Sequence, residues 1–271
     1  MRAKENMASI IKALVGVMYI IPIILGVLFS IQTNRDILLA PFEFITDNPT
    51  IENYIYVLEN IPILMYLKNT VIVVLICVPT QLILASLSSF GFTFYDFPGK
   101  EFIFTLFLSA MMIPGEVTLI ANFATVQLMG LYNTYAGLTI VSLVNVGCMF
   151  MLRQHMRGIP KELWEAARMD GCKEMKYFSK VVLPLSVPVL AAQGITSFIG
   201  SFNSYFWPMM ITNKQEMRTI QVGVAQLMDT ASATYGYVLA GAILCMIIPI
   251  IVFIFGQEYI VKGMTAGAVK N

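Results

Sequence analysis

Long apolar stretches divide this 271-residue chain into segments that are each long enough to cross a lipid bilayer. A spanning helix needs about 20 mostly apolar residues to cross ~30 Å of hydrocarbon. Six stretches meet this requirement, at residues 10–31, 66–88, 102–122, 134–152, 184–206 and 237–257. The first is too long for a typical signal-peptide core, and no small-residue cleavage site follows it. We therefore expect an all-α integral membrane protein with about six transmembrane helices, in a single domain over residues 1–271.

The composition agrees with a membrane protein and argues against a soluble one. Hydrophobic residues make up 58% of the chain and charged residues only 12%, whereas soluble domains carry about 25% charged residues. The formal net charge of +1 provides no field that would attract nucleic acid. We expect membrane lipid to surround the chain, and we do not expect nucleic acid as a partner.

Lysine and arginine are unevenly distributed between the connecting segments. If the N-terminus is cytoplasmic, the inside segments hold 13 of the 17 basic residues, and the outside segments hold only Arg35, Lys68, Lys214 and Arg218. Cytoplasmic segments of membrane proteins carry the excess of positive charge. The pattern predicts a multi-pass protein of the bacterial cytoplasmic membrane with both termini inside. It also places a long loop, 153–183, and a C-terminal tail, 258–271, in the cytoplasm.

The long inside loop contains the signals of a short helix at about residues 160–170. Pro160 suits the first helical position, Glu162 favours the positive end of the helix dipole, and Gly171 suits the left-handed residue that ends a helix. Two consecutive alanines leave the middle of this helix slim. Physical reasoning alone leaves two roles open: docking in a groove of another protein, or lying on the lipid headgroups.

The spacing of residues within the loop resembles a known family motif. Glu165-Ala166-Ala167 is followed after three residues by Gly171, and nine residues later come Val181, one residue, and Leu183-Pro184. This pattern resembles the EAA loop of binding-protein-dependent ABC permeases, with Val181 at the usual isoleucine position. Further segments resemble the carbohydrate-type branch, in particular the second permease of maltose-type importers: 97–100, 112–114, 159–163, 168–171 and 263–270.

The resemblance implies a transport role that depends on partner subunits. These are a second homologous permease, two ATP-binding subunits, and an extracellular lipid-anchored or periplasmic solute-binding protein. The loop would dock in a cleft of the ATPase, and residues 263–270 would reach toward the same interface. The implied coupling residues are Glu165, Ala166, Ala167, Asp170, Gly171, Leu183 and Pro184.

The chain lacks the sequence features of an enzyme. It contains no G-x-x-x-x-G-K-[ST] phosphate loop, so we expect ATP and Mg to bind the partner subunits and no cofactor to bind this chain. Four scattered cysteines without a C-x-x-C pair are typical of small apolar residues in packed helices. The single histidine, His155, has no obvious ligand partner. We therefore expect no catalytic residue and no metal site.

A few polar and aromatic residues in the apolar segments are candidates for lining a pathway. Glu116 and Asn122 lie in the third segment, where polar groups either face water or pair with a neighbouring helix. Asn203, Tyr205 and Trp207 lie at the end of the fifth segment, and their amide and ring groups suit the hydroxyls and C–H faces of a sugar. Tyrosine and tryptophan also anchor helices at membrane interfaces, so both roles stay open.

The expected function is import of a sugar or oligosaccharide. The expected segments contain almost no lysine or arginine, which favours a neutral solute over an anionic one. One alternative is an importer of the same class for glycerol phosphate or another polyol phosphate. A second alternative, from a different class, is an ion-coupled secondary transporter, although the chain shows no evident internal repeat.

Overall fold

The computed structural model describes residues 2–39, 44–230 and 234–265, and all regular secondary structure in these ranges is helical. The expected all-α class is therefore confirmed. The chain divides into two compact units, each assembled from segments that are distant in sequence. One unit comprises Met1–Tyr66 and Ile220–Ile248, and the other comprises Leu67–Thr219 and Pro249–Asn271.

The first unit joins the N-terminal helices to two helices from late in the chain. Asn53 stabilises it, because its Nδ2 donates to the carbonyl oxygens of Ser30 and Gln32, both at 2.8 Å. The rings of Tyr56 and Tyr237 stack with their centroids 3.8 Å apart. The elements are α1 (Arg2–Ser30), α2 (Asn34–Leu39), α3 (Glu52–Asn60), the first turn of α4 (Ile63–Phe94), α14 (Ile220–Thr230) and the N-terminal part of α15 (Tyr235–Thr265).

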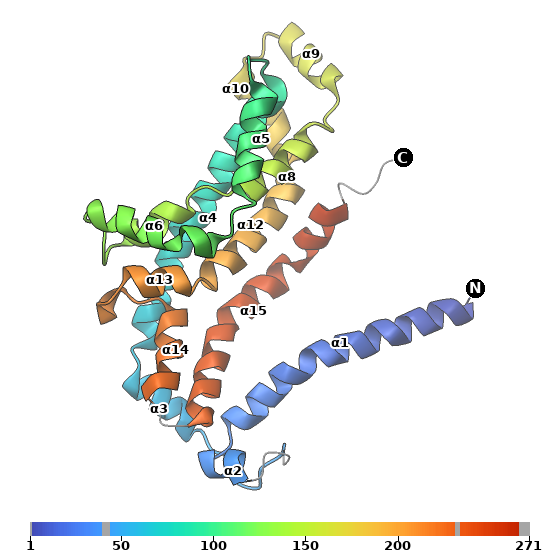
Figure 1. Cartoon of the computed structure of the whole chain (residues 1–271). Helices are drawn as coiled ribbons and strands as arrows, with labels where there is room; N and C mark the ends of the chain where they lie inside the picture. The colour runs from blue at the N-terminus through green and yellow to red at the C-terminus, as the bar shows by residue number, and fades with distance from the viewer. Residues whose placement is uncertain (1, 40–43, 231–233, 266–271) are drawn as a thin grey trace. The chain divides into compact units, whose positions relative to one another are not determined.

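The second unit is built around the rest of α4. Figure 1 shows α9 at one end of the helices of this unit, away from α6 and α13. Besides α4 and the C-terminal part of α15, its elements are α5 (Lys100–Ala110), α6 (Gly115–Leu128), α7 (Tyr135–Thr139), the 3-10 helix η1 (Ile140–Ser142), α8 (Val146–Met156), α9 (Lys161–Met169), α10 (Glu174–Tyr177), the π-helix η2 (Phe178–Val182), α11 (Leu183–Leu185), α12 (Val187–Phe202), α13 (Phe206–Ile211) and the 3-10 helix η3 (Gln215–Met217).

The predicted apolar segments differ in whether they form one continuous helix. Within the described residues, three helices are long and apolar enough to cross a membrane: Ile11–Ser30 of α1, all of α4, and Tyr235–Glu258 of α15. The other three segments are pairs of helices bent at a short break. The bends are 95° between α5 and α6, 44° between η1 and α8, and 74° between α11 and α12. Up to six spans result if each bent pair counts as one.

Local chemistry explains the breaks. Pro114 precedes α6 in an extended conformation, with φ −57° and ψ 135°, and a proline also disfavours helix at the residue before it. Asn145 begins α8 by accepting a hydrogen bond from the Cys148 N–H at 2.9 Å, as helix-capping asparagines do. The third break falls at Ser186, just before a proline in the first turn of α12. Each break therefore coincides with a residue that starts a new helix.

Two apolar clusters form the core of the second unit. One cluster joins α4, α5, α8 and α12 with the loop that follows α9, and includes Phe90, Phe104, Leu152, Tyr177 and Val189. The other joins α4, α6, α7 and α13 around Val73, Leu138 and Trp207. The first cluster lies at the base of the loop 153–183.

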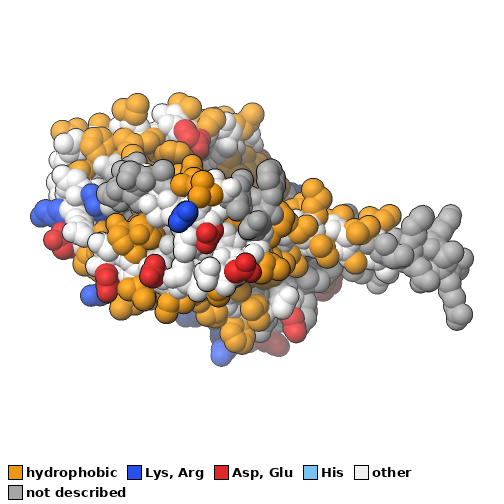
Figure 2. All heavy atoms as spheres, turned by 90° about the horizontal axis from the view of Figure 1, so that it is seen from below, with side chains coloured by type: hydrophobic (Ala, Val, Ile, Leu, Met, Phe, Trp, Pro, Cys, Tyr) orange, Lys and Arg blue, Asp and Glu red, His pale blue; other side chains and the backbone are white. Residues whose placement is uncertain are grey.

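Many large apolar side chains outside these clusters are exposed. Leu14, Met18 and Phe255 expose 65%, 74% and 78% of their surface. Figure 2 shows the same property on one face of the molecule, where hydrophobic side chains cover broad areas between separate charged groups. Contiguous apolar surface of this extent is unfavourable in water and suits lipid or a partner subunit.

The predicted tail 258–271 does not begin at a helix end. Helix α15 continues to Thr265, and residues 266–271 lie outside the described residues. Most of the tail motif that resembled the family, at 263–270, is therefore outside the described part of the chain.

Candidate functional site

Helix α9 occupies the place of the helix predicted at 160–170. Pro160 precedes it as the N-cap residue, one position earlier than the sequence suggested. Glu162 lies in its first turn, as expected. Gly171 follows with φ 69°, and its N–H donates to the carbonyl oxygen of Arg168 at 3.0 Å. The glycine is thus in the left-handed conformation that ends a helix.

Helix α9 is amphipathic and is held to the bundle by one aromatic residue. Trp164 and Ala167, three residues apart, pack against the apolar cluster of α4, α5, α8 and α12. The Trp164 ring lies 4.7 Å from the ring of the buried Tyr177. The Arg168 guanidinium lies 5.8 Å from the centre of the Trp164 ring, within the range of a cation–π contact. The partly buried Trp164 thus connects α9 to the helices beneath it.

The opposite face of α9 is exposed. Glu165, Ala166 and Met169 lie on it, and Met169 exposes 90% of its surface. An apolar and acidic surface around a small central residue is the kind of face that fits a groove of a protein partner.

The structure separates the predicted coupling residues into two groups. Five lie exposed on or beside α9 and α11: Glu165, Ala166, Asp170, Gly171 and Pro184. Ala167 and Leu183 are half-buried and pack on the core. The two alanines of the motif therefore differ in exposure, which the spacing of the motif does not reveal.

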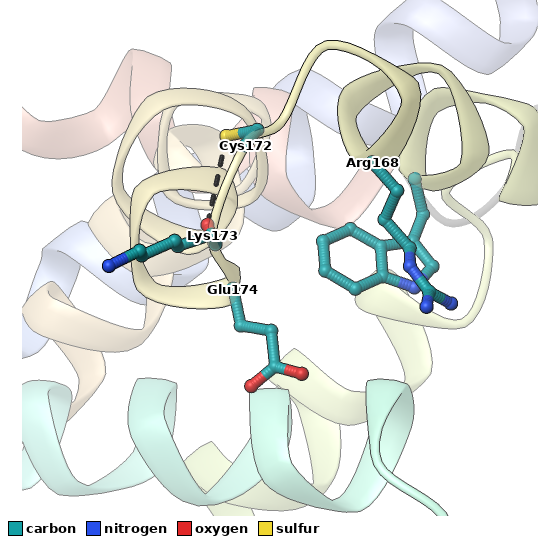
Figure 3. Close-up of a pocket in the computed structure, with 5 residues that line it drawn as sticks. Arg168, Cys172, Lys173 and Glu174 are labelled. Carbon is teal, nitrogen blue, oxygen red and sulfur yellow. Dashed lines mark hydrogen bonds between the residues drawn. The ribbon is translucent and has the colours of Figure 1, made fainter.

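A hollow of about 360 Å³ lies between α9 and α10, lined by Trp164, Arg168, Cys172, Lys173 and Glu174. Figure 3 shows the side chains around this hollow, including the 3.7 Å contact from the Cys172 sulfur to the Lys173 carbonyl oxygen. The Glu174 carboxylate accepts a hydrogen bond from the Tyr95 hydroxyl. This bond raises the pKa of Tyr95, because it favours the protonated phenol. The contact joins the loop to the end of α4.

The candidates in the third segment lie on α6. Glu116 is exposed in the first turn of α6, immediately after the break, and Asn122 is half-buried further along the same helix. The 95° bend places α6 across the direction of α5 (Figure 1). Glu116 therefore lies at a corner of the fold and not within a straight span.

The candidates at the end of the fifth segment have different surroundings. Asn203 is exposed and Tyr205 is half-buried. Trp207 exposes only 8% of its surface, and its Nε1 donates to the carbonyl oxygen of Gly137 at 3.1 Å. In this conformation Trp207 contributes packing between α13 and α7.

Sequence reasoning did not select Gln81 and Ser142, which the structure joins beside the break between η1 and α8. Gln81 of α4 exposes only 6% of its surface, and its Nε2 donates to the carbonyl oxygen of Ser142 at 2.5 Å. The sequence did contain a signal that could have selected Gln81. It is the only glutamine in the apolar stretch 66–88, and polar side chains within spans are often functional.

These features define a class of protein: a multi-pass helical membrane protein with broken spans and an exposed amphipathic helix on a loop. The family comparison is more specific. The profile described as "Binding-protein-dependent transport system inner membrane component" matches residues 37–266, and the chain belongs to this family.

Curated relatives match almost the whole chain. The arabinooligosaccharides transport system permease protein AraQ of Halalkalibacterium halodurans is 31% identical over 262 residues, which cover 96% of this chain and 94% of that protein. The sn-glycerol-3-phosphate transport system permease protein UgpE of Brucella melitensis biotype 1 is 29% identical over 273 residues, with 97% of each chain covered.

A solved structure has the same fold. It is that of a bacterial ABC transporter involved in the import of the acidic polysaccharide alginate, and it matches with a TM-score of 0.80 and 22% identity. The match covers 96% of this chain and 98% of that chain. The likeness therefore extends over nearly the whole length of both chains.

Proposed function

We propose that this chain is one of two homologous permease subunits of an ATP-driven importer for a neutral sugar or oligosaccharide. The solute is delivered by an extracellular lipid-anchored or periplasmic binding protein. The observation that carries the proposal is the exposed face of α9, which presents Glu165, Ala166 and Asp170 beside the left-handed Gly171. Membership of a binding-protein-dependent transport family supports it.

Coupling to ATP hydrolysis follows from the two faces of α9. The exposed face docks in a cleft of an ATP-binding subunit, while Trp164 and Ala167 on the other face pack on the helices of the bundle. A shift of the docked helix therefore displaces packed side chains in the same unit, since close-packed interiors transmit displacement. ATP and Mg bind the two partner ATPases, and this chain is a non-catalytic subunit.

The orientation in the membrane follows from the same assignment. An ATPase is cytoplasmic, so the loop 153–183 is cytoplasmic. The excess of basic residues in that loop and near the N-terminus agrees with this placement. Both termini then lie in the cytoplasm of a bacterial cell.

The surroundings of Arg153, the one arginine that is buried among the described residues, favour a neutral solute. Arg153 exposes 3% of its surface and forms an ion pair with Glu101. Its charge is thus already matched, and it does not supply a site for phosphate. The similarity to AraQ agrees with an oligosaccharide. The similarity to UgpE supports the second candidate, glycerol phosphate or another polyol phosphate.

The test begins with co-purification of the tagged chain from its native membrane, followed by reconstitution in liposomes with ATP inside. We expect an ATPase and a second permease to purify with it, and ATP-dependent uptake of arabinotriose when the binding protein is added. Gly171→Asp should lose the ATPase, because it places a second carboxylate beside Asp170 on the docking face. Uptake of only sn-glycerol 3-phosphate would select the second candidate. Solute uptake by the chain alone, without ATP, would select an ion-coupled transporter.

A further inference from the structure

A cavity of about 490 Å³ lies where two of the broken spans meet. Gln81 of α4 lines it together with Met111, from the break between α5 and α6. Further lining residues are Asn145 in the break between η1 and α8, and Ser142 and Gly147 on either side of that break. Among the described residues that line it, none carries a charge. The volume is within the range of small-molecule sites, which are mostly apolar with a few polar groups.

One polar group in the lining is buried without a partner. The Gln81 amide donates through Nε2 to the Ser142 carbonyl oxygen. Its Oε1 is buried and accepts no hydrogen bond from any described residue. A buried amide oxygen without a donor is unfavourable, and native structures supply a donor from protein, water or ligand. Gln81 therefore has an unused acceptor beside a cavity large enough for a solute.

The break next to Gln81 contains further amide and hydroxyl groups. The Asn145 Oδ1 caps α8, and its Nδ2 lies 3.4 Å from the Ser197 hydroxyl of α12. Non-helical backbone at membrane depth is tolerated where it is buried in protein or lines a cavity. The cavity thus combines neutral hydrogen-bonding groups from this break with the apolar side chain of Met111.

We propose that this cavity is a subsite for the transported solute, in which the Gln81 amide turns so that its Oε1, buried in this conformation, accepts a hydrogen bond from a sugar hydroxyl. The proposal rests on the importer function given above, and it assigns direct solute contact to this subunit. Ser142 and Asn145 supply further hydroxyl and amide groups, and Met111 contacts the C–H face of the ring. A phosphorylated polyol would lose hydration there without meeting a positive charge, so the subsite selects neutral sugars.

The first experiment uses the complete reconstituted complex, with arabinotriose as the probe. Gln81→Met removes the amide at nearly constant volume. We expect it to lower the number of arabinotriose molecules imported per ATP hydrolysed about tenfold, the effect of losing one hydrogen bond at the upper end of the usual range. The ATPase rate should stay unchanged. Gln193→Met is the matched control, because Gln193 is also in a span but does not line the cavity.

The second experiment leaves Gln81 in place. Ser142→Cys is introduced in a Cys172→Ser background, in which the other native cysteines are buried. A membrane-impermeant methanethiosulfonate reagent should label position 142 in the complex. Arabinotriose with its binding protein should slow the labelling about tenfold, and sn-glycerol 3-phosphate should not.

The outcomes separate the subsite from the importer function. If the wild-type complex imports no neutral sugar, the proposed function fails and the subsite falls with it. If the wild type imports arabinotriose but Gln81→Met imports equally well and labelling is not slowed, the subsite alone is overturned. A decrease of uptake and ATPase rate together in Gln81→Met, without protection from labelling, would show that Gln81 only holds the break in place.

Discussion

Arg153 on α8 and Glu101 on α5 form an ion pair whose two members differ greatly in exposure. The Arg153 side chain exposes 3% of its surface and the Glu101 side chain 71%. The guanidinium also lies 3.8 Å from the centre of the Phe104 ring, and its Nε donates to the Phe92 carbonyl oxygen at 3.4 Å. The pair joins three helices immediately before the loop that carries α9.

This asymmetry predicts which member of the pair matters more for stability. Glu101→Ala leaves a buried guanidinium without its counter-charge and should destabilise the protein by about 3 kcal/mol. Arg153→Met replaces the buried charge by an apolar side chain and leaves Glu101 in solvent, so its cost should be smaller. Thermal unfolding of the purified complex in detergent measures both, with the exposed Glu162→Ala as control. A larger loss for Arg153→Met would contradict this account.

The backbone at Gly171 predicts a difference between two substitutions. A Cβ at Gly171 would meet no atom within 4 Å, so the cost of a side chain there comes from the φ of 69°. Asparagine tolerates this conformation, whereas a β-branched residue does not. Gly171→Val should lower ATP-dependent uptake about tenfold or more, and Gly171→Asn should retain most of it. Equal uptake by both variants, at equal membrane levels, would show that the left-handed turn is not needed for coupling.

In the first unit, a close approach predicts the effect of adding one methyl group. A Cβ at Gly236 would lie 2.7 Å from both Nδ2 and Oδ1 of Asn53, and Asn53 cannot move without giving up its bonds to Ser30 and Gln32. Gly236→Ala should therefore lower the free energy of unfolding by about 2 kcal/mol. Gly16→Ala is the control, because a Cβ there meets nothing within 4 Å. The idea fails if both variants unfold at the same temperature.

The bond between Tyr95 and Glu174 predicts a dependence on pH. Because the pKa of Tyr95 is raised in the folded protein, folding favours the neutral phenol. This contribution is complete below the ordinary tyrosine pKa of about 10 and is lost as the pH rises through the raised value. The difference in unfolding temperature between wild type and Tyr95→Phe should be constant near neutral pH and shrink above about pH 10. A difference that persists unchanged at higher pH would exclude the phenol proton as its cause.

Local signals explain why the sequence predicts α9 so closely. Pro160 and Gly171 act within a few residues of the helix ends, and the structure has Lys161–Met169 for the predicted 160–170. The same loop carried the family resemblance, because Glu165, Ala166 and Gly171 are recognised by spacing alone. Both properties depend on neighbouring residues and need no tertiary contact.

The breaks in three spans were not predicted, because hydropathy measures how apolar a segment is and carries no information on the direction of its backbone. Residues 102–122 are apolar throughout, yet the chain turns by 95° within them. Pro114 was visible in the sequence, but a proline within a span is also compatible with a kinked continuous helix. The pairing of Gln81 with Ser142 joins residues 61 positions apart, and no local pattern specifies it.

The sequence by itself determined that the chain is a helical membrane protein, where its apolar segments lie, and which loop carries the spacing that resembles the family motif. These properties follow from composition, hydrophobic length and local spacing. The tertiary structure decided that Ala167 packs on the core while Ala166 faces outward, that Trp207 is buried, and that Gln81 reaches a break in another span. These depend on which helices pack together, because a side chain is buried or paired only by residues that the fold brings to it.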